Sequence, residues 1–209
     1  PPRQLGDEQV RFAHVMPAHW LDQAEPSAGD GDTSFARRPL PTWTHQTEHG
    51  VLQRTVALRR QSENQPSALL VRWRNVSERP MRLEVRALLG CCNVDHLPPV
   101  DDSFDGTLHA RGASWGFRPT NELPHLWLTV DGISAFRSDP VWYRNFLYAT
   151  DRLRGYDHVG HRWSPGVLEL DLPPGGEATA SFALGDPCAD AGAAFDEIAA
   201  EAQQLWHQV

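Results

Sequence analysis

Two short motifs in the chain have the spacing of known catalytic sites. The first, His45-Gln46-Thr47-Glu48-His49, matches H-x-x-E-H, a zinc-protease pattern that needs both histidines one helical turn apart. Pro39 and Pro41 precede this motif and Gly50 follows it, which leaves too little chain for the required helix. We therefore interpret the match as accidental and predict no metal site.

The second motif, Gly112-Ala113-Ser114-Trp115-Gly116, matches the G-x-S-x-G nucleophile elbow of esterases. That elbow needs a strand before the serine and a helix after it. Phe117-Arg118-Pro119 follows and does not start a helix, so we interpret the motif as a short strand bounded by glycines. His158 with His161, and the acidic cluster around Asp101 and Asp105, are interpreted as solvated loops.

The segment 139–166 contains the residue types that bind carbohydrate. Flat aromatic rings pack against the apolar faces of pyranoses, and Asp, Asn and Arg side chains make paired hydrogen bonds with adjacent hydroxyls. Trp142, Phe146 and Tyr148 share parity along a strand, and we expect them to face inward. The candidate contacts in this segment are Tyr143, Asn145, Asp151, Arg154 and Trp163. A purely structural role for the segment stays open.

Asp151 and Arg154 are close in sequence, in an expected loop after the strand 142–148 and just before Gly155. Opposite charges at this spacing can form an ion pair that holds the loop in place. They can also face a cleft and bind sugar hydroxyls. Gly155 and Pro165-Gly166 indicate a tightly specified loop, so we favour the structural pair.

The elements that must position these residues are mainly strands. Apolar residues alternate with polar ones at Leu69–Trp73, Met81–Leu89, Leu126–Val130 and Leu168–Leu172. This period predicts strands with one buried face. Weaker strands are predicted near 9–15, 51–60, 112–118, 142–148 and 178–184. Asp131-Gly132 between two apolar runs predicts a hairpin. Many short strands without intervening helices indicate a mainly β fold, an antiparallel β-sandwich.

The period changes near the end of the chain. Asp186-Pro187 supplies a helix N-cap and first-turn proline, and Phe195, Ile198, Leu205 and Trp206 then fall on one helical face. We therefore expect a β-sandwich domain over residues 1–186 and a C-terminal amphipathic α-helix over 187–209. Residues 22–38 are expected to form a long surface loop.

Charge and composition exclude several classes of function. The chain has 209 residues, of which 40% are hydrophobic, and a formal net charge of −8. Nucleic-acid duplexes and anionic membranes both need a basic surface, so neither partner is expected. The chain has no lysine, which excludes Schiff-base chemistry on this chain. Its three cysteines form no disulfide framework, which favours a cytoplasmic protein. The sequence indicates no cofactor.

The order of several residues in 139–166 resembles a known family. The matching positions are Tyr148, Asp151, Arg154-Gly155, Asp157 and Ser164-Pro165-Gly166. They are similar to the run Y-x-x-E-x-x-R-G-x-D-x-x-E-D-x-x-x-P-G in the N-terminal domain of bacterial and archaeal glycogen debranching enzymes. Pro39-Leu40-Pro41-Thr42-Trp43 and the stretch Leu88–Leu97 also resemble family segments, so the likeness covers about residues 35–170.

The chain departs from the family pattern at several of these positions. The family's glutamate is Asp151 here, its acidic pair falls at Gly160-His161, and its arginine before Asp95 is Asn93. His96 occupies the family's histidine position and joins the candidate carbohydrate contacts.

The resemblance implies a β-sandwich of the galactose-mutarotase-like supersandwich type. In the family this domain precedes an (α/α)6-barrel that holds the catalytic carboxylates, so no catalytic residue is expected in this chain. The helix 187–209 would be the connector to that barrel. The implied function is a non-catalytic domain that supports or lines the α-glucan cleft of an amylo-α-1,6-glucosidase.

Two alternatives remain at this point. One is an autonomous sugar epimerase or mutarotase-like enzyme, which needs a converging carboxylate base and histidine acid, for which Asp95 and His96 are the available residues. The other is a purely structural or oligomerisation sandwich.

Overall fold

The structure is a computed structural model. It describes residues 31–63, 65–91, 97, 100, 103–132 and 134–207, together with the backbone of two short paired strands, β1 (Gln4–Leu5) and β2 (Glu8–Gln9). Among these residues no helix is long and apolar enough to cross a membrane.

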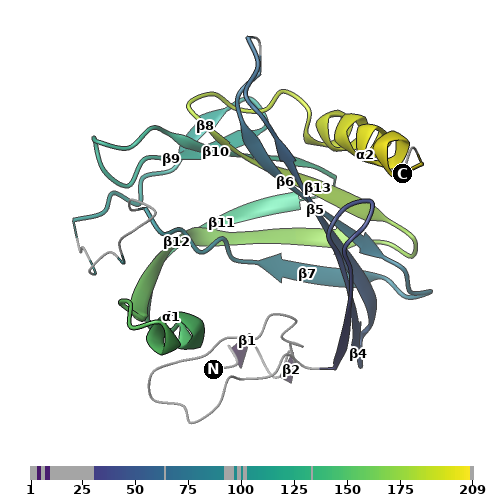
Figure 1. The fold of residues 1–209 in the computed structure, drawn as a ribbon, viewed down its shortest axis with the longest axis horizontal. Coiled ribbons are helices and arrows are strands. Elements are labelled where there is room, and N and C mark those ends of the chain that lie inside the picture. The colour runs from purple at the N-terminus through teal and green to yellow at the C-terminus, as the bar shows by residue number, and fades with distance from the viewer. Residues whose placement is uncertain are drawn as a thin grey trace.

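The larger of two packed sheets is antiparallel and has eight strands in the order β3-β4-β5-β6-β13-β10-β9-β8 (Figure 1). Its strands are β3 (Asp32–Ala36), β4 (Thr42–Thr47), β5 (Gly50–Arg59), β6 (Ala68–Asn75), β8 (His109–Arg111), β9 (Ser114–Phe117), β10 (Leu126–Asp131) and β13 (Glu177–Leu184). The predicted mainly antiparallel β fold is confirmed, although the predicted loop over 22–38 is wrong at β3, whose residues are all exposed.

The smaller sheet has three antiparallel strands in the order β11-β12-β7. They are β11 (Ser134–Leu147), β12 (Val159–Leu172) and β7 (Met81–Val85). The predicted alternation along β12 buries Leu168, Leu170 and Leu172. These three leucines join Val71 and Trp73 of the larger sheet in one hydrophobic core, so the two sheets pack face to face as a sandwich.

The predicted hairpin at Asp131-Gly132 is wrong. The strands on its two sides, β10 and β11, belong to different sheets, and the turn carries the chain from one layer to the other. Both edges of β10 are already occupied, because it pairs with β9 on one side and with β13 on the other. A turn signal alone does not show which strand pairs with which.

Strand β6 is covered on both faces. Val71 and Trp73 face the core between the sheets, as the sequence predicted, whereas Leu69 near the strand start is exposed. Leu70 points to the opposite face, where it packs in a second apolar cluster with Phe195 of the C-terminal helix.

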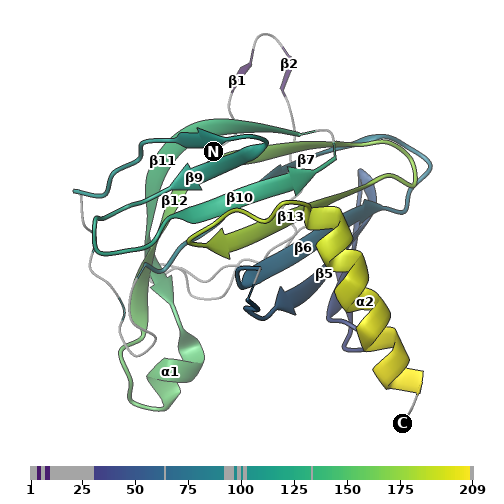
Figure 2. The same cartoon turned by 90° about the horizontal axis from the view of Figure 1, so that it is seen from above.

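The C-terminal helix α2 (Ala191–His207) lies across the larger sheet, on the side away from the three-stranded sheet (Figures 1 and 2). The predicted cap at Asp186 is wrong, because the helix begins later, with Asp190 as its N-cap. The Asp190 carboxylate accepts the N–H of Ala193 at 2.8 Å. Cys188, buried against the sheet, lies between the two positions. The far end of α2 leaves Leu205 and Trp206 exposed, with Trp206 beneath the guanidinium of Arg38.

Candidate functional site

Neither catalytic-looking motif forms a site. His45 lies on β4 and His49 in the turn after it, so the two histidines are not one helical turn apart. His45 is 2% exposed, and its Nδ1 is 3.0 Å from the Thr33 hydroxyl oxygen. In the described residues no group of three or more potential metal ligands is present.

Ser114 of the G-x-S-x-G motif is a buried residue at the start of β9. Its hydroxyl oxygen is 2.7 Å from the Thr129 hydroxyl oxygen on β10. No helix follows β9 where the elbow would require one. The hydroxyl is therefore committed to an internal hydrogen bond rather than exposed as a nucleophile.

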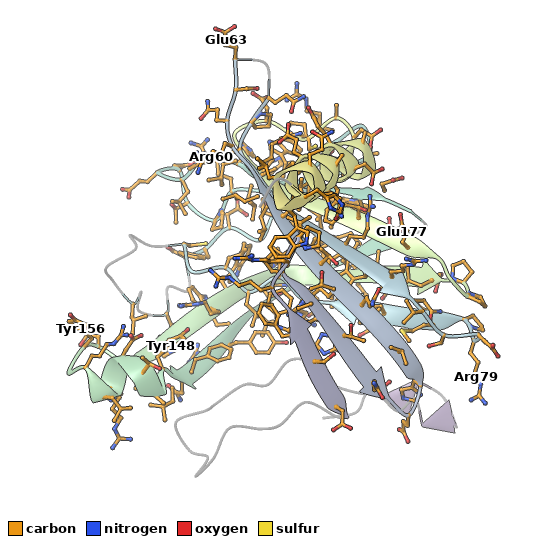
Figure 3. All side chains as sticks on the ribbon, turned by 45° about the vertical axis from the view of Figure 1, so that its right-hand side comes forward. Arg60, Glu63, Arg79, Tyr148, Tyr156 and Glu177 are labelled. Carbon is orange, nitrogen blue, oxygen red and sulfur yellow. The ribbon has the colours of Figure 1, made fainter. Side chains whose placement is uncertain are left out.

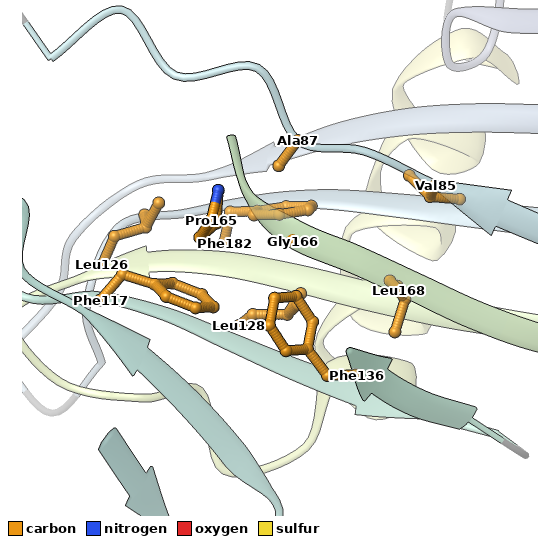
Figure 4. Close-up of a pocket in the computed structure, with 10 residues that line it drawn as sticks. All are labelled: Val85, Ala87, Phe117, Leu126, Leu128, Phe136, Pro165, Gly166, Leu168 and Phe182. Atoms are coloured by element: carbon orange, nitrogen blue, oxygen red, sulfur yellow. The ribbon is translucent and has the colours of Figure 1, made fainter. Parts of the chain in front are cut away.

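The cavity that the described residues enclose between the two sheets is too small for a sugar. Figure 4 shows the cavity there, which is lined by apolar side chains such as Phe117, Leu128, Phe136 and Phe182. Its volume is about 10 Å³, room for about one water molecule. A larger surface hollow of about 410 Å³ lies between the turns 47–51 and 76–79, and its described lining contains no Trp, Tyr or Phe ring.

The segment singled out from the sequence forms a two-stranded ribbon. Strands β11 and β12 extend away from the sandwich and carry the short helix α1 (Ala149–Leu153) at their end (Figure 2). The predicted loop after residue 148 therefore begins with a helix. In Figure 3, Tyr148 and Tyr156 lie near α1, far from Arg79 at the other end of the molecule.

A β-bulge interrupts the ribbon between Tyr143 and Phe146. Tyr143 pairs with Arg162, but the next pair is Phe146 with Gly160, so β11 has one residue more than β12 here. Asn145 lies in the bulge with a left-handed φ of 63°. Its N–H donates to Nδ1 of His161 at 3.1 Å, which requires that nitrogen to be unprotonated.

The bulge changes which side chains share a face. Arg162 and Gly160 lie on one side of β12, so their partners Tyr143 and Phe146 lie on that side too. Trp142 faces the opposite side, where it contacts Phe104 in the core. The expectation that Trp142, Phe146 and Tyr148 share an inward face is therefore wrong, because the extra residue reverses the alternation.

The predicted carbohydrate contacts differ in how far they are exposed to solvent. Tyr143 is partly buried and Asn145 is exposed, both on the ribbon. Trp163 needs correction, because it is 2% exposed and packs in the core against Phe104, which leaves no free ring face for a sugar. His96, like Asp95, lies outside the described residues.

Asp151 is partly buried on α1, and Arg154 is exposed just after the helix. The contact between these two residues is a backbone hydrogen bond, from the Arg154 N–H to the Asp151 carbonyl at 3.1 Å. The ion pairs of the described residues do not include the side-chain pair that the sequence favoured. Residues 151–154 are therefore held by backbone hydrogen bonds at the end of α1.

Two arginines that the sequence did not single out lie beside the aromatic rings of the ribbon. They are Arg86, just after β7, and Arg162 on β12. With Tyr143 and Tyr148 they form a row of four side chains on the side of the ribbon opposite Trp142, and we call Arg86, Tyr143, Arg162 and Tyr148 the Tyr–Arg strip. The guanidinium carbon of Arg86 is 5.9 Å from the centre of the Tyr143 ring, and that of Arg162 is 5.3 Å from the centre of the Tyr148 ring. The only sequence signal for this strip was the aromatic content of 139–166, because the bulge cannot be read from alternation.

Ion pairs continue from the Tyr–Arg strip along the three-stranded sheet. Arg86 and Arg137 both pair with Asp139, and Arg137 and Arg82 both donate to the Glu169 carboxylate. Burial opposes ionisation of Glu169, but the hydrogen bonds from Arg137 and Arg82 outweigh it and hold the pKa of Glu169 below its usual value.

A family model described as "Glycogen debranching enzyme N terminal" matches residues 19–179, a range that includes the whole ribbon and the Tyr–Arg strip. The chain belongs to the glycogen debranching enzyme N-terminal family. The family resemblance seen in the sequence is thereby confirmed. No curated protein and no solved structure matches the chain. The debranching-enzyme match ends within β13, so α2 lies beyond it.

Proposed function

We propose that this chain is the non-catalytic N-terminal β-sandwich of a glycogen debranching enzyme, and that it helps to form the cleft that holds the α-glucan. Hydrolysis of the α-1,6 branch linkages is assigned to a separate (α/α)6-barrel domain. The observation that carries the proposal is the family match over residues 19–179. We also propose a cytoplasmic location, because a debranching enzyme acts where its glycogen substrate is stored, and we take that compartment to be the cytoplasm.

The ribbon supports the glucan-binding part of the proposal. Hydrolysis at a glycosidic bond needs two carboxyl groups that flank it, and we assign no such pair to this chain. The ribbon instead offers aromatic rings and hydrogen-bonding side chains, which suit sugar contacts. The proposed contacts are Tyr143, Asn145, Asp151 and Arg154, with His96 retained from the sequence.

Helix α2 is proposed as the connector to the barrel. Its first half packs on the sandwich through Ala191, Ala194 and Phe195. Its second half leaves Leu205 and Trp206 exposed, which suits contact with a further domain.

Activity measurements test this proposal. We expect the purified 209-residue chain to release no glucose from a limit dextrin, whereas the complete debranching enzyme releases it. In the complete enzyme, Tyr143→Ala should raise KM for the dextrin and leave the thermal midpoint nearly unchanged. Tyr143→Phe keeps the ring and is the matched control. Glucose release by the chain alone would overturn the non-catalytic assignment.

A further inference from the structure

We infer that Arg162, with the Tyr148 ring beside it, forms a subsite for one glucosyl unit of an α-glucan on the side of the ribbon opposite Trp142. This inference rests on the proposed function and deepens it. It assigns a specific anchor residue, Arg162, which the sequence did not single out within the segment 139–166.

The hydrogen bonding of Arg162 is incomplete. Its side chain is partly buried, yet among the described residues its one hydrogen bond runs from Nη1 to the His161 carbonyl oxygen at 2.8 Å. A guanidinium has five N–H donors, so most of the donors of Arg162 are left for another acceptor. Arg86 and Arg137 on the same sheet differ in this respect, because both pair with the Asp139 carboxylate.

The backbone of β12 allows the aromatic ring to lie beside this guanidinium. A Cβ atom on Gly160 would lie 2.8 Å from Cε2 of Tyr148, so a larger residue would displace the ring. Glycine at this position lets Tyr148 pack directly on the strand, next to Arg162. Tyr143, the register partner of Arg162, lies on the same side.

These groups match the chemistry of a glucosyl unit. Two adjacent hydroxyl oxygens can accept parallel hydrogen bonds from the guanidinium fork, and the C–H face of the sugar can pack on an aromatic ring. Arg162 would therefore set the orientation of the sugar, and Tyr148 and Tyr143 would supply apolar contact. An α-glucan is uncharged, so the subsite needs no charged side chain besides Arg162 to bind it.

Calorimetric titration of the 209-residue chain with maltoheptaose tests the subsite. Arg162→Met keeps the apolar stem and removes every donor, so we expect binding about tenfold weaker or worse. Arg162→Lys keeps the charge but loses the fork, and should also weaken binding. The matched control is Arg74→Met, an exposed arginine near the end of β6, which should bind as the wild type does.

A second measurement does not depend on how the variants fold. The Nε–H resonance of Arg162 in the wild-type chain should shift on addition of maltoheptaose. No binding by the wild-type chain, or equal binding by a folded Arg162→Met variant, overturns the inference. Competition by inorganic phosphate would also overturn it, because Arg162 would then be an anion site.

The outcomes separate this inference from the proposed function. If Arg162→Met binds normally while Tyr143→Ala raises KM in the complete enzyme, the subsite is wrong and the cleft-lining role stands. If the chain alone releases glucose, the non-catalytic assignment fails, and the titration still decides the role of Arg162.

Discussion

The guanidinium carbon of Arg72 on β6 lies 4.2 Å from the centre of the Phe195 ring on α2. The same guanidinium donates to the Thr179 hydroxyl at 2.8 Å, to the Asp196 carboxylate at 2.7 Å and to the Gly192 carbonyl oxygen at 3.3 Å. One arginine thus joins two strands of the larger sheet to the first turns of the helix. Its contacts fix where α2 lies on the sandwich.

Replacing Arg72 should therefore destabilise the protein. Arg72→Met keeps the contact with Phe195 but leaves the buried Thr179 hydroxyl without its donor, and we expect a loss of about 2 kcal/mol in the free energy of unfolding. Asp196→Asn is the control, since the Asp196 side chain is 67% exposed and its ion pair should contribute less than about 1 kcal/mol. Urea denaturation measures both, and equal effects of the two substitutions would contradict this account.

His45 should make the stability of the fold depend on pH. Burial, helped by the nearby charge of Arg54, lowers the pKa of His45 from its ordinary value of 6.5. The unfolded chain then binds a proton more readily than the folded chain does. The stabilisation is present above pH 6.5 and is lost as the pH falls through 6.5 toward the lowered pKa.

Substituting His45 tests this linkage. We expect the free energy of unfolding of the wild type to fall between about pH 8 and about pH 5, and His45→Gln to fall less steeply over that range. His49→Gln, on the exposed turn of the same hairpin, is the matched control. Parallel curves for wild type and His45→Gln would show that His45 does not carry the effect.

Asn145 should tolerate glycine better than alanine. Its φ of 63° is a conformation that glycine adopts freely and that alanine adopts at a cost of about 1 kcal/mol. We expect Asn145→Gly to be nearly neutral and Asn145→Ala to destabilise the chain by that amount in chemical denaturation. Asn121→Ala, in an exposed turn without positive φ, should stay within about 0.5 kcal/mol of the wild type. An equal cost for both Asn145 variants would contradict the backbone explanation.

Arg154 should contribute little to folding. Its side chain is exposed, and its backbone N–H, rather than its guanidinium, makes the contact with Asp151. Arg154→Ala should change the free energy of unfolding by less than about 0.5 kcal/mol, and thermal denaturation would show it. A loss of several degrees in the melting temperature would instead support the structural ion pair that the sequence favoured. If Arg154 binds glucan, as proposed, the same variant should weaken maltoheptaose binding.

The sequence alone predicted the features that depend on local pattern. Alternating apolar residues on β7, β10 and β12, and the change of period near α2, depend on side chains a few positions apart. Pro39, Pro41 and Gly50 were enough to reject a helical zinc motif, because they restrict the backbone where they stand. The order of residues in 139–166 was enough to indicate the family.

Only the tertiary structure decided which strands pair and which side chains meet. Asp131-Gly132 has the local chemistry of a hairpin, but the partners of β10 come from distant parts of the chain. The extra residue in the bulge at Asn145 reverses the alternation along β11 after it, so Tyr148 lies on the same side as Arg162. Trp163 enters the core beside Phe104, a contact between residues far apart in the sequence. Strand register is set by contacts between residues far apart in sequence, and period counting within one strand does not contain that information.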